Sequence, residues 1–138
     1  DGNIEITLES DVTFGSGKKD LTKAGRSSIA GLRSILTDDY AGLQLRVIGH
    51  TDNEPLKKTK KLFDDNRGLG SARALSVVRF LESDVGIDPT RLVSGSRGSH
   101  DPVASNDTKA GRAKNRRVEI VVVMPREVAV LGAQAQAK

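Results

Sequence analysis

An aspartate and an arginine are the two residues whose types and settings point most directly to chemistry. Asp52 ends the run Gly49-His50-Thr51-Asp52, which follows an alternating apolar segment typical of a buried strand. Arg73 lies in a segment of helical periodicity and falls on its apolar arc, between Leu69 and Val77. A carboxylate and a guanidinium held together would match the ammonium and the carboxylate of an amino-acid zwitterion.

Each of these two residues also has an ordinary structural explanation. An arginine on an apolar helix face can belong to an internal ion pair, or it can extend its charged end to solvent. An aspartate after a strand is often a turn residue or a helix cap. The pair is more informative than either member, because ligands tend to bind at the carboxyl ends of strands in α/β sheets.

The sequence predicts neither an enzyme nor a metal site. It has two histidines, His50 and His100, and no G-x-S-x-G motif that would present a nucleophilic serine. It has no cysteine, which excludes disulfides, thiolate catalysis and cysteine-ligated zinc. His50 and Asp52 lie close in sequence, but no third ligand is grouped with them. We therefore expect no catalytic residue, no metal and no cofactor.

The rest of the chain alternates between strand and helix patterns. Alternating or short apolar runs predict strands at 4–8, 43–50, 91–93 and 118–122. Helical spacing predicts a helix over 20–36 with Asp20 as its N-cap, a second over 71–83, and one helical turn at 109–113. This β-α-β-α-β-β order predicts an α/β fold, a single-domain two-layer sandwich with helices on one face of a small mixed β-sheet.

Length and composition fit one small domain. The chain has 138 residues, of which 36 % are hydrophobic and 3 % aromatic, so its core must be aliphatic. We expect residues 1–124 to form the domain and residues 125–138 to be a flexible C-terminal extension. No run approaches the ~20 apolar residues of a membrane span. We therefore expect any membrane association to come from segments outside this chain.

Four motifs in a fixed order are the most specific feature of the sequence. They are Ile48-Gly49-His50-Thr51-Asp52, Asn66-x-x-Leu69-x-x-x-Arg73-Ala74, Pro102-x-x-x-Asn106 and Gly111-Arg112-Ala113-x-Asn115-Arg116-Arg117-Val118-Glu119-Ile120. With Phe14-Gly15-Ser16-Gly17 before them, these motifs closely resemble the OmpA-like peptidoglycan-binding domain, the family of the C-terminal domains of OmpA, Pal and MotB. The resemblance runs from about Val12 to about Val123.

The resemblance implies non-catalytic binding of peptidoglycan through the diaminopimelate of its stem peptide, whose free end carries an ammonium and a carboxylate. It assigns that zwitterion to Asp52 and Arg73, the pair that the residues themselves single out. The other positions that the motifs place at the pocket, or in support of it, are Thr51, Asn66, Leu69 and Arg117. His50 fits a packing role as well as a ligand contact.

The same resemblance implies a periplasmic anchor of the cell envelope, which tethers an outer-membrane or inner-membrane partner to the wall. The membrane and the oligomeric state, a homodimer included, stay open. Two departures from the family pattern stand out. Gly70 takes the place of the usual serine, and the segment 54–65 is longer than in OmpA or Pal and looks more like MotB. We expect this Lys-rich loop to be mobile and to make no contact with the ligand.

Nucleic-acid binding is the alternative from another functional class. Lys57–Lys61 and Arg112–Arg117 are basic clusters in a chain of net charge +4, and such clusters can follow phosphates. The low aromatic content leaves few surfaces for base stacking. Acidic residues also interrupt the positive surface, at Asp64, Asp65, Asp101 and Asp107. These features favour a partner other than nucleic acid.

Overall fold

Four strands form one mixed sheet in the computed structural model, which describes residues 2–125 and residue 132. The strands are β1 (Ile4–Glu9), β2 (Leu45–His50), β3 (Leu92–Gly98) and β4 (Arg117–Val122). Their order across the sheet is β1-β4-β2-β3. β4 is antiparallel to β1 and to β2, whereas β2 and β3 are parallel. The expected extension at 125–138 falls, apart from residues 125 and 132, outside the described residues.

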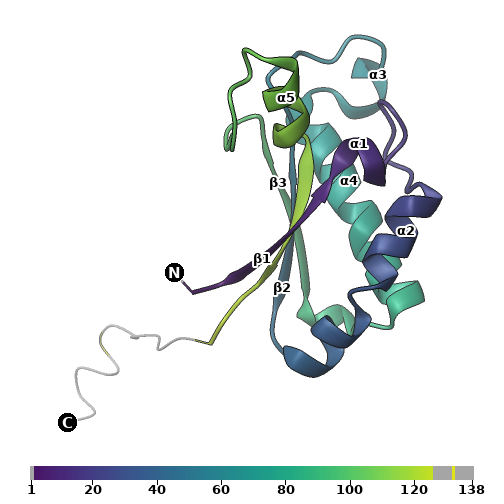
Figure 1. The fold of residues 1–138 in the computed structure, drawn as a ribbon, viewed down its shortest axis with the longest axis vertical. Coiled ribbons are helices and arrows are strands. Elements are labelled where there is room, and N and C mark those ends of the chain that lie inside the picture. The colour runs from purple at the N-terminus through teal and green to yellow at the C-terminus, as the bar shows by residue number, and fades with distance from the viewer. Residues whose placement is uncertain (1, 126–131, 133–138) are drawn as a thin grey trace.

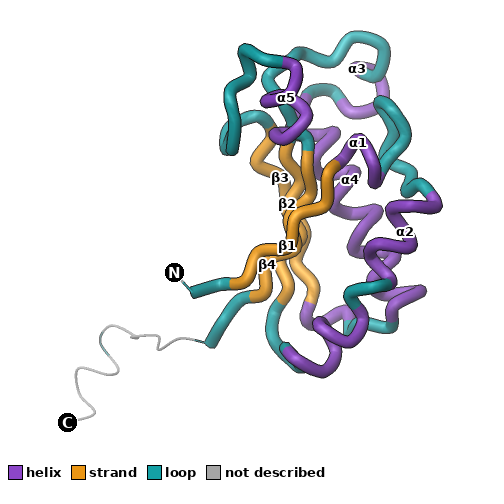
Figure 2. The backbone as a smooth tube through the Cα atoms, viewed as in Figure 1, coloured by secondary structure: helices purple, strands orange, loops and turns teal. Residues whose placement is uncertain are grey.

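Helices cover one face of this sheet, as Figures 1 and 2 show. The two longest are α2 (Lys23–Ala30) and α4 (Asn66–Phe80). The shorter ones are α1 (Ser10–Thr13), α3 (Lys60–Phe63) and α5 (Lys109–Asn115), with single turns at Ile35–Asp39, Leu81–Val85 and Pro89–Arg91. The two-layer α/β sandwich is therefore confirmed. The loops that carry α3 and α5 gather at one end of the sheet, in the upper part of Figure 1.

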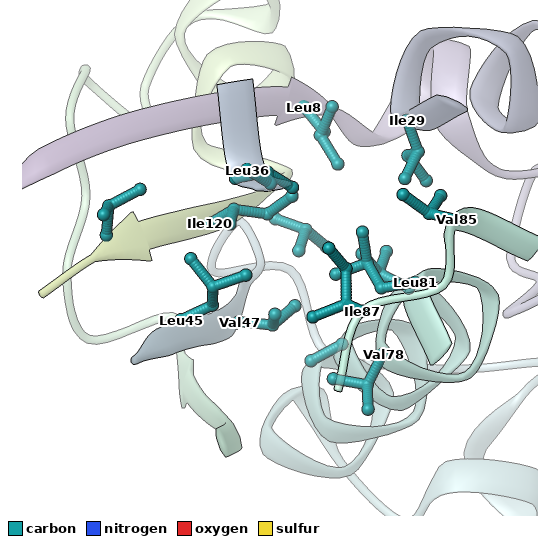
Figure 3. Packing of buried hydrophobic residues seen from close by; sticks show 14 of the residues in the cluster. Leu8, Ile29, Leu36, Leu45, Val47, Val78, Leu81, Val85, Ile87 and Ile120 are labelled. Carbon is teal, nitrogen blue, oxygen red and sulfur yellow. The ribbon is translucent and has the colours of Figure 1, made fainter. Parts of the chain in front are cut away.

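The core is aliphatic and lies between the sheet and the helices. Alternate residues of β4, Val118, Ile120 and Val122, are fully buried on the helix side. Figure 3 shows Val47 and Ile120 of the sheet with Leu81 and other side chains of the helical layer. Since side chains alternate along a strand, the residues between them belong to the opposite face of the sheet. That face includes Arg117 and Glu119.

The first long helix starts and ends elsewhere than predicted. Asp20 does not cap it. Thr22 does, because its hydroxyl accepts a 2.9 Å hydrogen bond from the amide of Gly25. The helix ends at Ala30, and a separate turn at Ile35–Asp39 continues toward β2. The apolar spacing over 20–36 therefore spans two elements that share one buried face.

The second long helix begins five positions earlier than the predicted start at Ser71. Asp65 caps it through a 2.9 Å hydrogen bond from the amide of Gly68 to its carboxylate. Two glycines, Gly68 and Gly70, hide this first turn in the sequence, because glycine is a poor helix former. The early start places Asn66 and Leu69 on the same helix as Arg73.

Close packing between β2 and α4 explains the glycine at position 70. A Cβ atom on Gly49 would collide with the backbone oxygen of Gly70, and a Cβ on Gly70 would collide with the hydroxyl of Ser96. Ser96 belongs to the part of β3 that extends beyond the predicted 91–93, as far as Gly98. Small residues on three elements thus allow the helix to lie close to the sheet beneath the carboxyl end of β2.

Candidate functional site

A cavity of about 300 Å³ lies where β2 ends, and it collects five of the six residues that the motifs predict. Thr51 and Asp52 follow directly from the strand. Asn66, Leu69 and Arg73 come from α4, where spacings of three and four residues put side chains on one face. The prediction that these side chains lie together therefore agrees with the structure.

The carboxylate of Asp52 is buried and held in one orientation. Its Oδ2 atom accepts a 2.6 Å hydrogen bond from Nη1 of Arg116, and its Oδ1 atom accepts one of 3.0 Å from the amide of Glu54. Arg116 also bonds both carboxylate oxygens of Asp11, at 3.0 Å and 2.9 Å. These bonds raise the pKa of Arg116 above its usual range and lower that of Asp11. One guanidinium therefore bridges two carboxylates at the edge of the cavity.

Arg73 is the buried cation of the site. Its Nε atom donates a 2.8 Å hydrogen bond to the backbone oxygen of Lys18, and its guanidinium lies 5.0 Å from the centre of the Phe14 ring. No carboxylate of the described residues forms an ion pair with it. Burial lowers the pKa of Arg73, whereas the negative charges of Asp11 and Asp52 act to raise it. A buried guanidinium without a carboxylate partner is a ready group for an anionic ligand.

Part of the Lys-rich loop lines the cavity, and its contact with a ligand stays a prediction to be tested. The loop residues that line the cavity are Glu54, Pro55, Leu56, Lys57 and Thr59. Two bonds hold the start of this loop: Asn66 donates to the backbone oxygen of Glu54 at 2.9 Å, and Arg112 pairs with the Glu54 carboxylate at 2.9 Å. The loop is therefore a wall of the site.

Arg117 and His50 do not line this cavity. Arg117 donates a 2.8 Å hydrogen bond to Glu119 and one of 3.0 Å to the backbone oxygen of Asp101. His50 is paired with the same carboxylate, its Nε2 atom 3.1 Å from Glu119. Both side chains are buried, and they belong to the sheet face away from the main core. They join β2 and β4 to the loop after β3, beside the site.

Arg116 and Asp11 also belong to the site, although neither is among the residues predicted for it. The sequence has two consecutive arginines here, and the resemblance assigns Arg117 to the pocket. Arg116, the residue between α5 and β4, lines the cavity instead. Asp11 carried no local signal, because its partner lies 105 positions later in the chain.

The described residues contain no group of three or more histidine, aspartate or glutamate side chains that could hold a metal ion. Within the same part of the chain, no helix has both the length and the apolar character needed to span a bilayer.

Fold and site together define a class: a two-layer α/β domain with a four-stranded mixed sheet and a cavity of paired charges at the carboxyl end of β2. Comparison with protein families places the chain within that class. Residues 13–116 match the model of the OmpA family. The chain belongs to this family.

Individual relatives agree with this assignment. The chain is 33 % identical over 124 residues to motility protein B of Bacillus subtilis, covering 90 % of this chain and 46 % of the relative. Its structure resembles the periplasmic domain of Helicobacter pylori MotB, with a TM-score of 0.76, 30 % identity, and coverage of 85 % of this chain and 79 % of that one. The cell wall anchor of the T6SS from Pseudomonas aeruginosa gives a TM-score of 0.76 at 31 % identity, covering 87 % and 80 %. The chain spans about half, or less, of the length of its curated relatives.

Proposed function

We propose that this domain binds peptidoglycan without cleaving it and so anchors an envelope protein to the cell wall in the periplasm. The observation that carries the proposal is one cavity with an oriented carboxylate, Asp52, and a buried guanidinium without a carboxylate partner, Arg73. Membership of the OmpA family and the similarity to a cell wall anchor support it.

The ligand group that this pair fits is the free end of diaminopimelate in the stem peptide. Its ammonium bonds the carboxylate of Asp52, and its carboxylate takes the guanidinium of Arg73 in a forked contact. Both protein groups are held before the ligand arrives, Asp52 by Arg116 and Arg73 by Lys18 and Phe14. Preorganisation of this kind improves affinity, because less side-chain freedom is lost on binding.

The remaining predicted residues have supporting roles in this proposal. Thr51 and Leu69 form walls of the cavity, and Asn66 fixes the loop that closes one side of it. Arg117 supports the site from the neighbouring strand through its bonds to Glu119 and Asp101. Binding of this type is reversible and needs neither a cofactor nor a nucleophile. Segments outside the chain would supply the membrane attachment.

The structure weakens one of the two sequence arguments for nucleic-acid binding, the arginine cluster. Three arginines of the 112–117 cluster are engaged with carboxylates: Arg112 with Glu54, Arg116 with Asp11 and Asp52, and Arg117 with Glu119. Guanidinium groups that are paired in this way are poorly available to phosphates. The arginine cluster is therefore better explained as part of the framework of the cavity.

The proposal is tested by sedimentation with purified sacculi. The wild-type domain should co-sediment, and chromatography of the supernatant should show no released muropeptides. Asp52→Ala should weaken binding by about 2–4 kcal/mol, as is usual when one partner of a buried charge contact is removed. Asp39→Ala, at an exposed aspartate, is the matched control. A wild-type domain that stays in solution, or that releases soluble muropeptides, contradicts the proposal.

A further inference from the structure

A second cavity, of about 420 Å³, adjoins the first. Three residues line both of them: Pro55, Leu56 and Asn66. The two cavities are therefore separated by a wall made of the loop after Asp52 and the first residue of α4. A ligand that fills the first cavity and continues past this wall enters the second.

The wall between the cavities is fixed to the helix. The side-chain amide of Asn66 donates to the backbone oxygens of Asp52, at 3.3 Å, and of Glu54, at 2.9 Å. Asp52 Oδ1 accepts from the amide of Glu54 in the same turn. The two Asn66 bonds tie the segment that leaves Asp52 to the start of α4, and the third bond fixes the turn within that segment, so the two cavities keep their relative placement.

The lining of the second cavity carries charges of both signs. Its cations are Lys60 of α3 and Arg67 of α4, and its carboxylates are those of Asp64 and Asp65. The Asp65 carboxylate is engaged as the cap of α4, where it accepts from the amide of Gly68. Neutral polar groups come from Asn53 and Ser99. Arg67 uses Nη1 for a 2.9 Å bond to the backbone oxygen of Ser96. Among the described residues, neither Lys60 nor Arg67 has a carboxylate partner in an ion pair.

A rare backbone turn shapes this cavity. Asp64 has φ 69° and ψ −58°, and the amide of Asp65 donates a 2.8 Å hydrogen bond to the backbone oxygen of Phe63. These are the features of a three-residue γ-turn of the strained kind, which an L-residue rarely adopts. The turn lets α3 end directly before α4 begins. It therefore brings Lys60 and Arg67, from two separate helices, to one cavity.

We propose that the second cavity is a subsite for the stem-peptide residue that adjoins the diaminopimelate. This inference rests on the proposed function of the first cavity. Cationic Lys60 and Arg67 match a free carboxylate on that residue. Asn53 and Ser99 can donate to a peptide carbonyl, and the Asp64 carboxylate can accept from a peptide N–H. The domain then recognises a segment of peptide rather than one amino acid.

Three ligands separate the two cavities in a binding experiment. They are free diaminopimelate, a stem tripeptide in which γ-linked D-glutamate precedes diaminopimelate, and the same tripeptide on its disaccharide. The wild-type domain should bind the tripeptide more tightly than the free amino acid. Lys60→Gln should weaken tripeptide binding about two- to fivefold, and Lys60→Glu more, whereas both should leave free diaminopimelate binding unchanged. Lys61→Gln, the neighbouring lysine outside both cavity linings, is the matched control.

The outcomes distinguish the two proposals. If the wild-type domain binds diaminopimelate but gains nothing from the tripeptide, or if Lys60→Gln weakens both ligands equally, the subsite is wrong and the first cavity stands. An effect of Lys60→Gln that is seen only with the disaccharide also overturns the peptide assignment, because the cavity then contacts sugar. If the folded wild-type domain binds none of the three ligands, the proposed function itself fails.

Discussion

Nη1 of Arg116 lies 2.6 Å from Oδ2 of Asp52, so the central carboxylate of the site is oriented by a residue 64 positions later in the chain. The same guanidinium pairs with Asp11 at 2.9 Å. The Asp52 side chain is 11 % exposed and that of Asp11 is 54 % exposed. The inner pair, Arg116–Asp52, is thus largely removed from water, whereas the outer pair, Arg116–Asp11, is not. The two pairs should therefore differ in their contribution to the free energy of unfolding.

Arg116→Met tests the inner pair. It leaves the Asp52 carboxylate buried without a cationic partner, so the free energy of unfolding should fall by about 1–3 kcal/mol. Asp11→Asn leaves the inner pair intact and should lower it by less than about 1 kcal/mol. Urea denaturation at neutral pH measures both variants. Equal losses would mean that the bridge acts as a surface ion pair and does not orient Asp52.

Arg73→Lys tests the forked contact without removing the positive charge. A lysine ammonium cannot make two parallel bonds to a carboxylate, and it loses the stacking on Phe14. Binding to peptidoglycan should therefore weaken by about 2 kcal/mol or more. Arg79→Lys, an exposed arginine of the same helix, should bind like the wild type. Comparable affinities of both variants would remove Arg73 from the ligand contact.

Stability should respond to loss of Arg73 differently from what the apolar helix arc alone indicates. A buried charge that lacks partners destabilises a fold, so the apolar arc alone predicts that deletion of this charge leaves stability nearly unchanged or raises it. In the structure the guanidinium holds the loop before α2 through the backbone oxygen of Lys18 and the ring of Phe14. Arg73→Met should therefore lower the free energy of unfolding by about 1 kcal/mol. Thermal and urea denaturation would show whether the free energy of unfolding falls or rises.

The parts of the site that could be predicted are those carried by one element or by a short motif. Alternation along β2 and β4 identifies the faces of the sheet, and helical spacing places Arg73 on the buried side of α4. The burial of that arginine, at 6 % exposure, agrees with its place on the apolar arc. Asp52 was predictable for a similar reason, because a buried strand ends directly before it.

The parts that could not be predicted depend on contacts between distant segments. The bond from Arg73 to the backbone oxygen of Lys18 spans 55 positions and involves a backbone atom, which leaves no trace in residue type. The loop after Asp52 is rich in lysine, and its sequence gives no sign of the contacts that it makes. Its role as a wall depends on one amide, Asn66, and one arginine, Arg112, that hold Glu54 from two other elements.

The contact of β2 with α4 gives a prediction about three small residues. Gly49→Ala would place a methyl group against the backbone of Gly70, which cannot move alone, so it should lower the free energy of unfolding by about 2–3 kcal/mol. Gly70→Ala meets the Ser96 hydroxyl instead, and alanine also favours the helix, so its effect should be smaller. Ser96→Ala should reduce the loss of stability that Gly70→Ala causes, but not the loss that Gly49→Ala causes. A double-mutant cycle that shows no coupling between positions 70 and 96 would contradict this account.

His50 should make stability depend on pH. Burial and the charge of Arg117 lower the pKa of His50, although Glu119 and Asp101 oppose this. Below about pH 6.5 the unfolded chain binds a proton that the folded domain takes up only at lower pH. The free energy of unfolding should therefore fall as the pH drops from 7 toward 5, by up to about 1.4 kcal/mol for each unit by which the pKa is lowered. His50→Gln should lose this part of the pH dependence, and His100→Gln, at an exposed histidine, should keep it.

The lysines of the loop should divide into two kinetic classes. Lys57 lines the first cavity, whereas Lys58 and Lys61 line neither the first nor the second. All three are exposed and without an ion pair among the described residues, so each adds to the field that attracts an anionic wall. Lys58→Gln with Lys61→Gln should slow association with surface-captured peptidoglycan fragments and reduce its salt dependence, while dissociation stays almost unchanged. Lys57→Gln should also speed dissociation, because it alters a wall of the occupied cavity. Faster dissociation in the Lys58 and Lys61 variant would show that the whole loop closes over the ligand, and identical traces for all variants would show that its charge has no part in binding.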